Sequence, residues 1–126
     1  MNFESILGVA KELALSSGRR ILEIYNSEDF EVKIKEDKSP LTKADTAANE
    51  VIVSGIREIF PKHGILTEEE KDDKERLDKE FVWIIDPLDG TKEFIKRNGE
   101  FTVNIGLVRN GKPILGVIYV PAKNEL

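Results

Sequence analysis

The sequence contains no cysteine and only one histidine, His63. The absence of cysteine excludes disulfide bonds, thiolate catalysis and cysteine-based zinc sites, and one histidine cannot build a histidine-rich metal site. Any metal ion would therefore have to be bound by oxygen atoms. We read His63 itself as a surface residue beside Pro61, because the sequence offers it no evident partner.

Long apolar runs and an excess of positive charge are also missing. No segment reaches the roughly 20 apolar residues of a membrane span, and the N-terminus lacks the basic and then apolar pattern of a signal peptide. We therefore expect a cytoplasmic protein without a membrane partner. The net charge of −5 argues against a nucleic acid polymer as partner, since tracking a phosphate backbone requires a basic face. A small anionic substrate is still compatible with this charge if metal ions supply positive charge locally.

The 126 residues, of which 40% are hydrophobic, predict one soluble globular domain. Apolar residues recur with helical spacing from Phe3 to Asn26, and again from Ala44 to Ile59 before Pro61. Between these helices, alternation over Phe30 to Ile34 predicts a short strand or extended arm, followed by a polar loop from Lys35 to Pro40.

The rest of the chain reads mainly as strands. The expected strands are Gly64 to Thr67, Phe81 to Ile85, Phe101 to Leu107 and Ile114 to Val120. The second should be buried on both faces because it does not alternate, and Asn110-Gly111 predicts a hairpin between the last two. Lys71 to Glu80 reads as a solvated loop or frayed helix, and Lys92 to Ile95 as a short helix. The fold class is α+β, with two N-terminal helices packed on a mainly antiparallel sheet.

The segment from Asp86 to Thr91, DPLDGT, carries the most chemical information. Asp86 and Asp89 offer the oxygen ligands that magnesium prefers, and Gly90 lets backbone N–H groups approach an anion. A calcium EF-hand is excluded, because its loop would place Ile85 and Pro87 at ligand positions. Phosphatases with an aspartyl nucleophile space their carboxylates two apart, whereas here the spacing is three. An acidic turn that caps a helix is the remaining alternative to a metal and phosphate site.

Three blocks of the sequence resemble the inositol monophosphatase superfamily of magnesium-dependent, lithium-sensitive phosphatases. They are Ser39 to Asp45 (SPLTKAD), Ile65 to Glu69 (ILTEE) and Trp83 to Phe94 (WIIDPLDGTKEF). The resemblance is strongest to the 3′(2′),5′-bisphosphate nucleotidases, because Lys92-Glu93 stands where inositol phosphatases usually carry Thr-Asn. It also implies a layered α/β sugar-phosphatase-like fold, of which these residues would be the N-terminal half.

The resemblance implies a role for each site residue. Glu68, Asp86 and the carbonyl of Leu88 would bind one Mg²⁺, and Asp86 and Asp89 would share a second. Thr91, hydrogen-bonded to Asp45, would orient the attacking water. Gly90 and Thr91 would bind the phosphate through their backbone N–H groups, so Asp45, Thr91 and Glu68 form the expected catalytic set. Glu69 is a further candidate near the metals.

Each role has a simpler alternative in the local sequence. Asp45 could only favour the first turn of its helix through the macrodipole, and Glu68 to Glu70 could be a solvated acidic run.

Family members are about twice as long as this chain, so we expect residues 1–126 to be the N-terminal metal- and phosphate-binding domain, without the C-terminal substrate domain. The implied reaction is hydrolysis of adenosine 3′,5′-bisphosphate to AMP and phosphate. An inositol-1-phosphate or fructose-1,6-bisphosphate phosphatase is the close alternative, and a catalytically inactive half-domain that serves folding or assembly is an alternative of another class. The fragment alone is expected to bind magnesium weakly and to hydrolyse little. The oligomeric state stays open, with a homodimer as one alternative.

Overall fold

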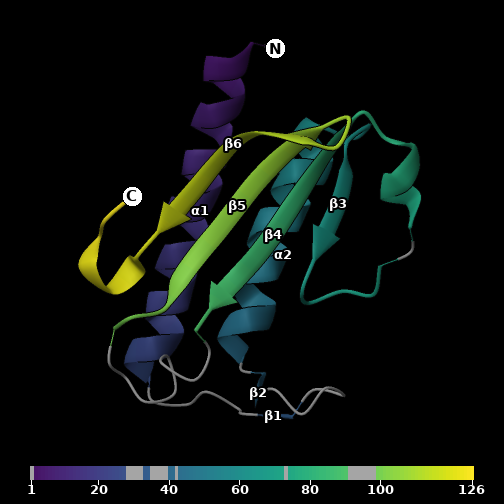
Figure 1. The fold of residues 1–126 in the computed structure, drawn as a ribbon. Helices are drawn as coiled ribbons and strands as arrows, with labels where there is room; N and C mark the ends of the chain where they lie inside the picture. The colour runs from purple at the N-terminus through teal and green to yellow at the C-terminus, as the bar shows by residue number, and fades with distance from the viewer. Residues whose placement is uncertain (1, 28–32, 35–39, 42, 73, 91–98) are drawn as a thin grey trace.

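The computed structural model of the protein describes residues 2–27, 33–34, 40–41, 43–72, 74–90 and 99–126. Two long helices and a four-stranded sheet make up most of this part of the chain (Figure 1). The helices are α1 (Phe3–Ser27) and α2 (Lys43–Ile59), and the sheet strands are β3 (Gly64–Thr67), β4 (Phe81–Asp89), β5 (Thr102–Arg109) and β6 (Lys112–Tyr119). Of two short 3-10 helices, η1 (Glu75–Asp78) lies between β3 and β4, and η2 (Pro121–Lys123) follows β6. The predicted α+β class is confirmed.

Both helices form where the apolar spacing predicts them. Asn2 caps α1, since its Oδ1 accepts a hydrogen bond of 2.8 Å from the Ser5 N–H, and α2 ends two residues before Pro61. In Figure 1 the two helices lie side by side behind the sheet and cover the same face of it. Among the described helices, none combines the length and the apolar character needed to cross a bilayer.

The sheet has the strand order β3-β4-β5-β6. β3 pairs with β4 in parallel, whereas β4 with β5 and β5 with β6 are antiparallel. The sheet is therefore mixed but mainly antiparallel, as expected. The β5–β6 hairpin turns at Asn110 and Gly111, whose φ angles of 49° and 82° are both positive, as a two-residue type I′ turn requires.

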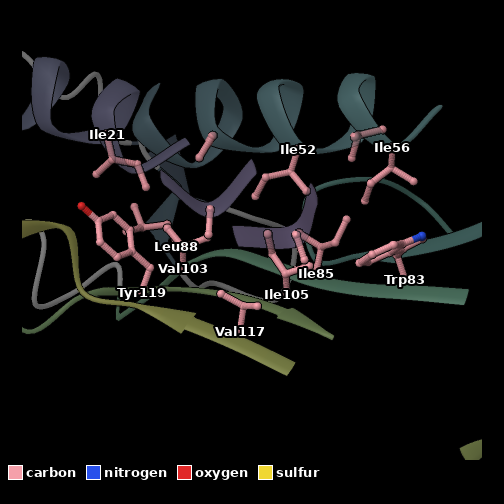
Figure 2. Packing of buried hydrophobic residues seen from close by; sticks show 14 of the residues in the cluster. Ile21, Ile52, Ile56, Trp83, Ile85, Leu88, Val103, Ile105, Val117 and Tyr119 are labelled. Atoms are coloured by element: carbon pink, nitrogen blue, oxygen red, sulfur yellow. The ribbon is translucent and has the colours of Figure 1, made fainter. Parts of the chain in front are cut away.

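The core lies between the two helices and the inner face of the sheet. Figure 2 shows Ile52 and Ile56 of α2 above Ile85, Ile105 and Trp83 of the sheet. Each of these side chains is almost completely buried. Burial of one such side chain stabilises the fold by about 1.5–3 kcal/mol, so this layer holds the sheet firmly against the helices.

The prediction that Phe81 to Ile85 is buried on both faces is wrong. Trp83 and Ile85 face the helices and are buried, but Ile84, which points the other way, is 48% exposed. The reason is that no described element covers the outer face of the sheet, the face turned away from α1 and α2. An apolar run alone does not show which of its faces finds a covering layer.

The reading of His63 as a surface residue without a partner is also wrong. Its ring stacks between Phe60 and Phe81, with centroid distances of 4.7 and 4.9 Å, and is only partly exposed. Because these aromatic residues come from the end of α2 and the start of β4, the histidine belongs to the packed junction between them.

The segment between the helices is described only in part. Lys33–Ile34 (β1) and Pro40–Leu41 (β2) form a small antiparallel ladder, so the strand expected at Phe30 to Ile34 is described at its last two residues. Pro40, expected at the end of a loop, pairs with Ile34 instead. The helix predicted around Lys92 to Ile95 lies outside the described residues.

Candidate active site

Glu68 and Asp86 are brought together by the parallel pairing of β3 and β4. Thr67, the last residue of β3, is in register with Ile85 of β4, so the residues that follow, Glu68 and Asp86, lie beside each other where β3 ends. The Glu68 N–H extends this ladder by donating a hydrogen bond of 3.3 Å to the carbonyl of Ile85. Two acidic residues 18 positions apart in the sequence thus become neighbours.

A β-bulge places Asp86 and Asp89 on the same face of the sheet. Asp86 is opposite Asn104 and Asp89 is opposite Thr102, so three steps along β4 match two steps along β5. Residues three apart on a regular strand point to opposite faces, but one extra residue restores a common face. The partners agree with this geometry, because the Asn104 side-chain amide donates a hydrogen bond of 2.9 Å to Thr102 Oγ1. The shared face is the outer, uncovered one.

Burial and neighbouring acidic groups together raise the pKa of Asp86. Its pKa is raised to about 6, first by burial of the half-buried carboxyl and then by the negative charges of Asp89, Glu68 and Glu69. A hydrogen bond from the Leu88 backbone N–H opposes part of this rise. The carboxyl groups of Glu68, Asp86 and Asp89 therefore lie close enough for their charges to interact, and Glu69 belongs to the same cluster.

An oxygen-only donor set that gathers negative charge fits a hard cation such as Mg²⁺. Within the described ranges, however, no three acidic or histidine side chains are already arranged as a metal site. The assignment of Glu68, Asp86, Asp89 and the Leu88 carbonyl as metal ligands stays a prediction.

Gly90 follows Asp89 with a φ of 87°, a left-handed conformation that residues with side chains rarely adopt. The chain can therefore turn sharply directly after the acidic residues. Thr91 lies outside the described residues. The predicted grip of Gly90 and Thr91 on phosphate, and the predicted hydrogen bond between Thr91 and Asp45, stay predictions.

Asp45 is fully buried in the first turn of α2. In Figure 1 this end of α2 lies at the end of the molecule where β4 stops. A buried carboxylate destabilises an apolar core unless it has partners. The place of Asp45 in the catalytic set stays a prediction.

A cavity of about 500 Å³ lies on the outer face of the sheet and reaches the acidic cluster. Its polar lining residues are Thr67, Glu68, Asp86 and Asn104, and the other lining residues are apolar residues and glycines of the four strands. Two of the candidate ligands, Glu68 and Asp86, therefore line a space large enough for a small molecule.

Sequence reasoning missed Asn49, which is 5% exposed on α2. Its side chain contacts both Thr67 and Glu70, on either side of Glu68 and Glu69. The signal was present in the sequence, because Asn49 follows Asp45 by four residues and so lies on the same helix face, beside the apolar Ala48 and Ile52. A polar residue on a core-facing stripe was a candidate for a specific contact.

Known proteins resemble the chain over nearly all of its length. Residues 2–126 match the family model described as the inositol monophosphatase family. The chain is 50% identical over 117 residues to the Escherichia coli (strain K12) protein named 3′(2′),5′-bisphosphate nucleotidase CysQ, covering 91% of this chain and 48% of that protein. It is also 38% identical over 122 residues to the Nus factor SuhB of the same organism, covering 96% of this chain and 45% of that protein.

A solved structure of CysQ from Bacteroides thetaiotaomicron, described as a bacterial member of the inositol monophosphatase family, superposes on the chain with a TM-score of 0.79. The two sequences are 51% identical, and the match covers 97% of this chain and 44% of that one. The chain thus spans about half the length of the relatives that it matches.

Proposed function

The chain belongs to the inositol monophosphatase family, and from this premise we propose that it is the metal- and phosphate-binding half of a magnesium-dependent phosphomonoester hydrolase. The observation that carries the proposal is the convergence of Glu68, Glu69 and Asp89 on Asp86, whose charges add to the effect of burial in raising the pKa of Asp86 to about 6. The fold brings these acidic groups together from separate segments of the chain. A bound cation would neutralise their combined negative charge.

Each residue of the candidate site has a distinct task in the proposed reaction. Glu68, Asp86, Asp89 and the Leu88 carbonyl bind the cations. When bound, Mg²⁺ supplies a Lewis acid that neutralises phosphate charge and lowers the pKa of a water molecule. Thr91 and Asp45 orient the water that attacks phosphorus, and the backbone of Gly90 and Thr91 holds the phosphate oxygens.

The proposed substrate is a 3′(2′),5′-bisphosphate nucleotide, with adenosine 3′,5′-bisphosphate converted to AMP and phosphate. The 50% identity to CysQ and the Lys92-Glu93 pair favour this reading. An inositol or sugar phosphate is the second candidate, favoured by the family match and by the similarity to SuhB at 38% identity. The proposal extends to inhibition by lithium and to a cytoplasmic location.

We also propose that a second half of the full-length protein covers the outer face of the sheet and completes the substrate cleft. That face is apolar and open, with Ile84 at 48% and Ile118 at 61% exposure. Between them Gly106 and Gly116 pair across β5 and β6, and a Cβ atom added at Gly116 would meet nothing within 4 Å. Glycine is not required there by the packing of this chain, but it leaves room for a neighbouring element to approach closely.

The relatives support this arrangement, since they extend over about twice the length of the chain. Exposed apolar sheet faces are normally covered by a second layer. The cavity that reaches Glu68 and Asp86 would then become a cleft between the two halves.

The test is release of phosphate by the full-length protein from adenosine 3′,5′-bisphosphate, inositol 1-phosphate and fructose 1,6-bisphosphate at one magnesium concentration. We expect the highest kcat/KM for the nucleotide and loss of all activity on addition of a chelator. Asp89→Asn is the matched variant and should be at least about 100-fold slower on every substrate, since transition-state charge loses its cation. Equal activity of this variant would contradict the role of the acidic cluster. If Asp89→Asn left every measured property of the full-length protein unchanged, that result would favour a non-catalytic assembly unit.

A further inference from the structure

Two buried polar side chains interrupt the apolar face of α2, Asp45 and, one turn later, Asn49. Asp45 is already part of the expected catalytic set. Asn49 is not, yet its side chain is buried against the segment that carries Glu68 and Glu69.

The hydrogen bonds of Asn49 fix its orientation. Its Nδ2 donates to Glu70 Oε2 at 2.7 Å, and its Oδ1 accepts from Thr67 Oγ1 at 2.6 Å. A carboxylate can only accept, so the amide nitrogen must face Glu70, and the carbonyl oxygen then faces the hydroxyl. Both bonds are short, and one involves a charged group, which makes it one of the stronger types.

These bonds hold both ends of the acidic segment from Thr67 to Glu70. Thr67 Oγ1 also accepts a hydrogen bond of 3.4 Å from the Glu69 N–H, and Arg57 donates to the second oxygen of Glu70 at 3.3 Å. The Glu68 N–H is bonded to the Ile85 carbonyl of β4. The backbone that carries Glu68 and Glu69 is therefore fastened to α2 on one side and to β4 on the other.

Such fastening has to act against electrostatic repulsion. Glu68 and Glu69 lie close enough to Asp86 for their negative charges, with that of Asp89, to add to the effect of burial in raising its pKa. Like charges at short range favour a segment that moves away. The Glu70 carboxylate bonds Asn49 and Arg57. The carboxylates of Glu68 and Glu69 instead act on the charge of Asp86.

We propose that Asn49 is a positioning residue: by bonding Thr67 and Glu70, it holds Glu68 and Glu69 against Asp86 in the geometry that binds the divalent cation. This inference rests on the proposed function, because it assumes that the acidic cluster takes up a cation. It assigns to α2 two tasks one turn apart, with Asp45 in the catalytic set and Asn49 behind the ligands.

The test is the dissociation constant for Mn²⁺, measured by electron paramagnetic resonance of the free ion with the folded full-length protein. Asn49→Asp replaces a donor by an acceptor opposite Glu70, and we expect Mn²⁺ binding to weaken by about tenfold or more, as is usual for residues that orient metal ligands. Combining Asn49→Asp with Glu70→Gln exchanges donor and acceptor and keeps the net charge, so binding should return to within about twofold of the wild type. Ser54→Ala is the control, since Ser54 lies on the same helix, is exposed and bonds only the backbone of Glu50 and Val51 in the described structure.

Thr67→Val provides a second route if Asn49→Asp does not fold. It keeps the side-chain shape but removes the hydroxyl, and it should weaken Mn²⁺ binding in a protein whose circular dichroism is unchanged. A purely structural role of Asn49 would lower the melting temperature and leave the dissociation constant of the folded protein unchanged. That result, or failure of the double variant to recover, would overturn the inference while leaving the proposed function intact. Absence of Mn²⁺ binding by the folded wild type would overturn both.

Discussion

Trp83 donates a hydrogen bond of 2.9 Å from its indole Nε1 to Nδ1 of His63. Accepting this bond requires the imidazole to be neutral at Nδ1, with its proton on Nε2. Burial of the ring lowers the pKa of His63, and the charge of Glu80 opposes part of that shift. The junction of α2, β3 and β4 thus depends on an uncharged histidine.

Acidification should weaken this junction. The folded-state pKa of His63 lies below the unfolded value of about 6.5, so the unfolded chain binds more protons as the pH falls through that range. The contribution of His63 to stability is complete above pH 6.5 and is lost progressively below it. Urea unfolding of the wild type and of His63→Asn, which does not titrate, should give a difference in unfolding free energy that shrinks from pH 7.5 to pH 5. A constant difference would contradict the neutral acceptor.

Asp86→Asn should stabilise the metal-free protein at neutral pH. The folded-state pKa of about 6 lies above the usual carboxyl value of 3.8. Ionisation of Asp86 therefore lowers the stability of the folded protein as the pH rises from about 4 through 6. Because Asp86 is only half-buried, solvent screening reduces the effect to about 1 kcal/mol in urea unfolding with chelator at pH 7.5. The gain should vanish near pH 4, and Mn²⁺ binding should be lost. No gain at pH 7.5 would show that burial and neighbouring charges do not raise the pKa of Asp86.

Gly18→Ala should destabilise the fold, whereas Gly8→Ala on the same helix should not. A Cβ at Gly18 would lie 2.8 Å from Cδ2 of Tyr119, a ring whose hydroxyl is bonded to Asn124. Nothing lies within 4 Å of a Cβ at Gly8. We expect a loss of about 1–3 kcal/mol at Gly18 from overpacking, and a gain of about 0.5–1 kcal/mol at Gly8 from helix propensity. Thermal unfolding of both variants checks this, and equal effects would contradict the packing of α1 on β6.

Ile118→Ser should reveal whether a second half covers the sheet. In the 126-residue chain the side chain is 61% exposed, so the substitution should change the unfolding free energy by less than about 0.5 kcal/mol. In the full-length protein the same change should cost about 2 kcal/mol, because the side chain would be buried. Leu77→Ser on η1 is the control, with 65% exposure away from the sheet, and should be small in both. Equal effects of Ile118→Ser in the two proteins would contradict the proposed cover.

The sequence predicted most of the fold because its elements carry local signals. Helical spacing set α2 to within one residue, and Asn110-Gly111 set the hairpin. Glu68 and Asp86 were assigned together only through the family resemblance, since no local pattern reveals the register that joins them. The bulge that aligns Asp86 with Asp89 depends on pairing with β5 and was not predictable from their spacing. His63 and Ile84 were misread for the same reason, because their surroundings come from distant segments or from the absence of a covering layer.

The most direct test of the central claim is paramagnetic broadening of amide signals by substoichiometric Mn²⁺ in the ¹⁵N-labelled chain. It detects weak binding and reports distance from the ion residue by residue. Convergence of the acidic groups predicts that the amide signals of Glu68, Glu69, Asp86 and Asp89 broaden first, together with that of Gly90. Broadening centred instead on the acidic residues of η1, with Asp86 and Asp89 unaffected, would contradict the claim that these carboxylates share a cation.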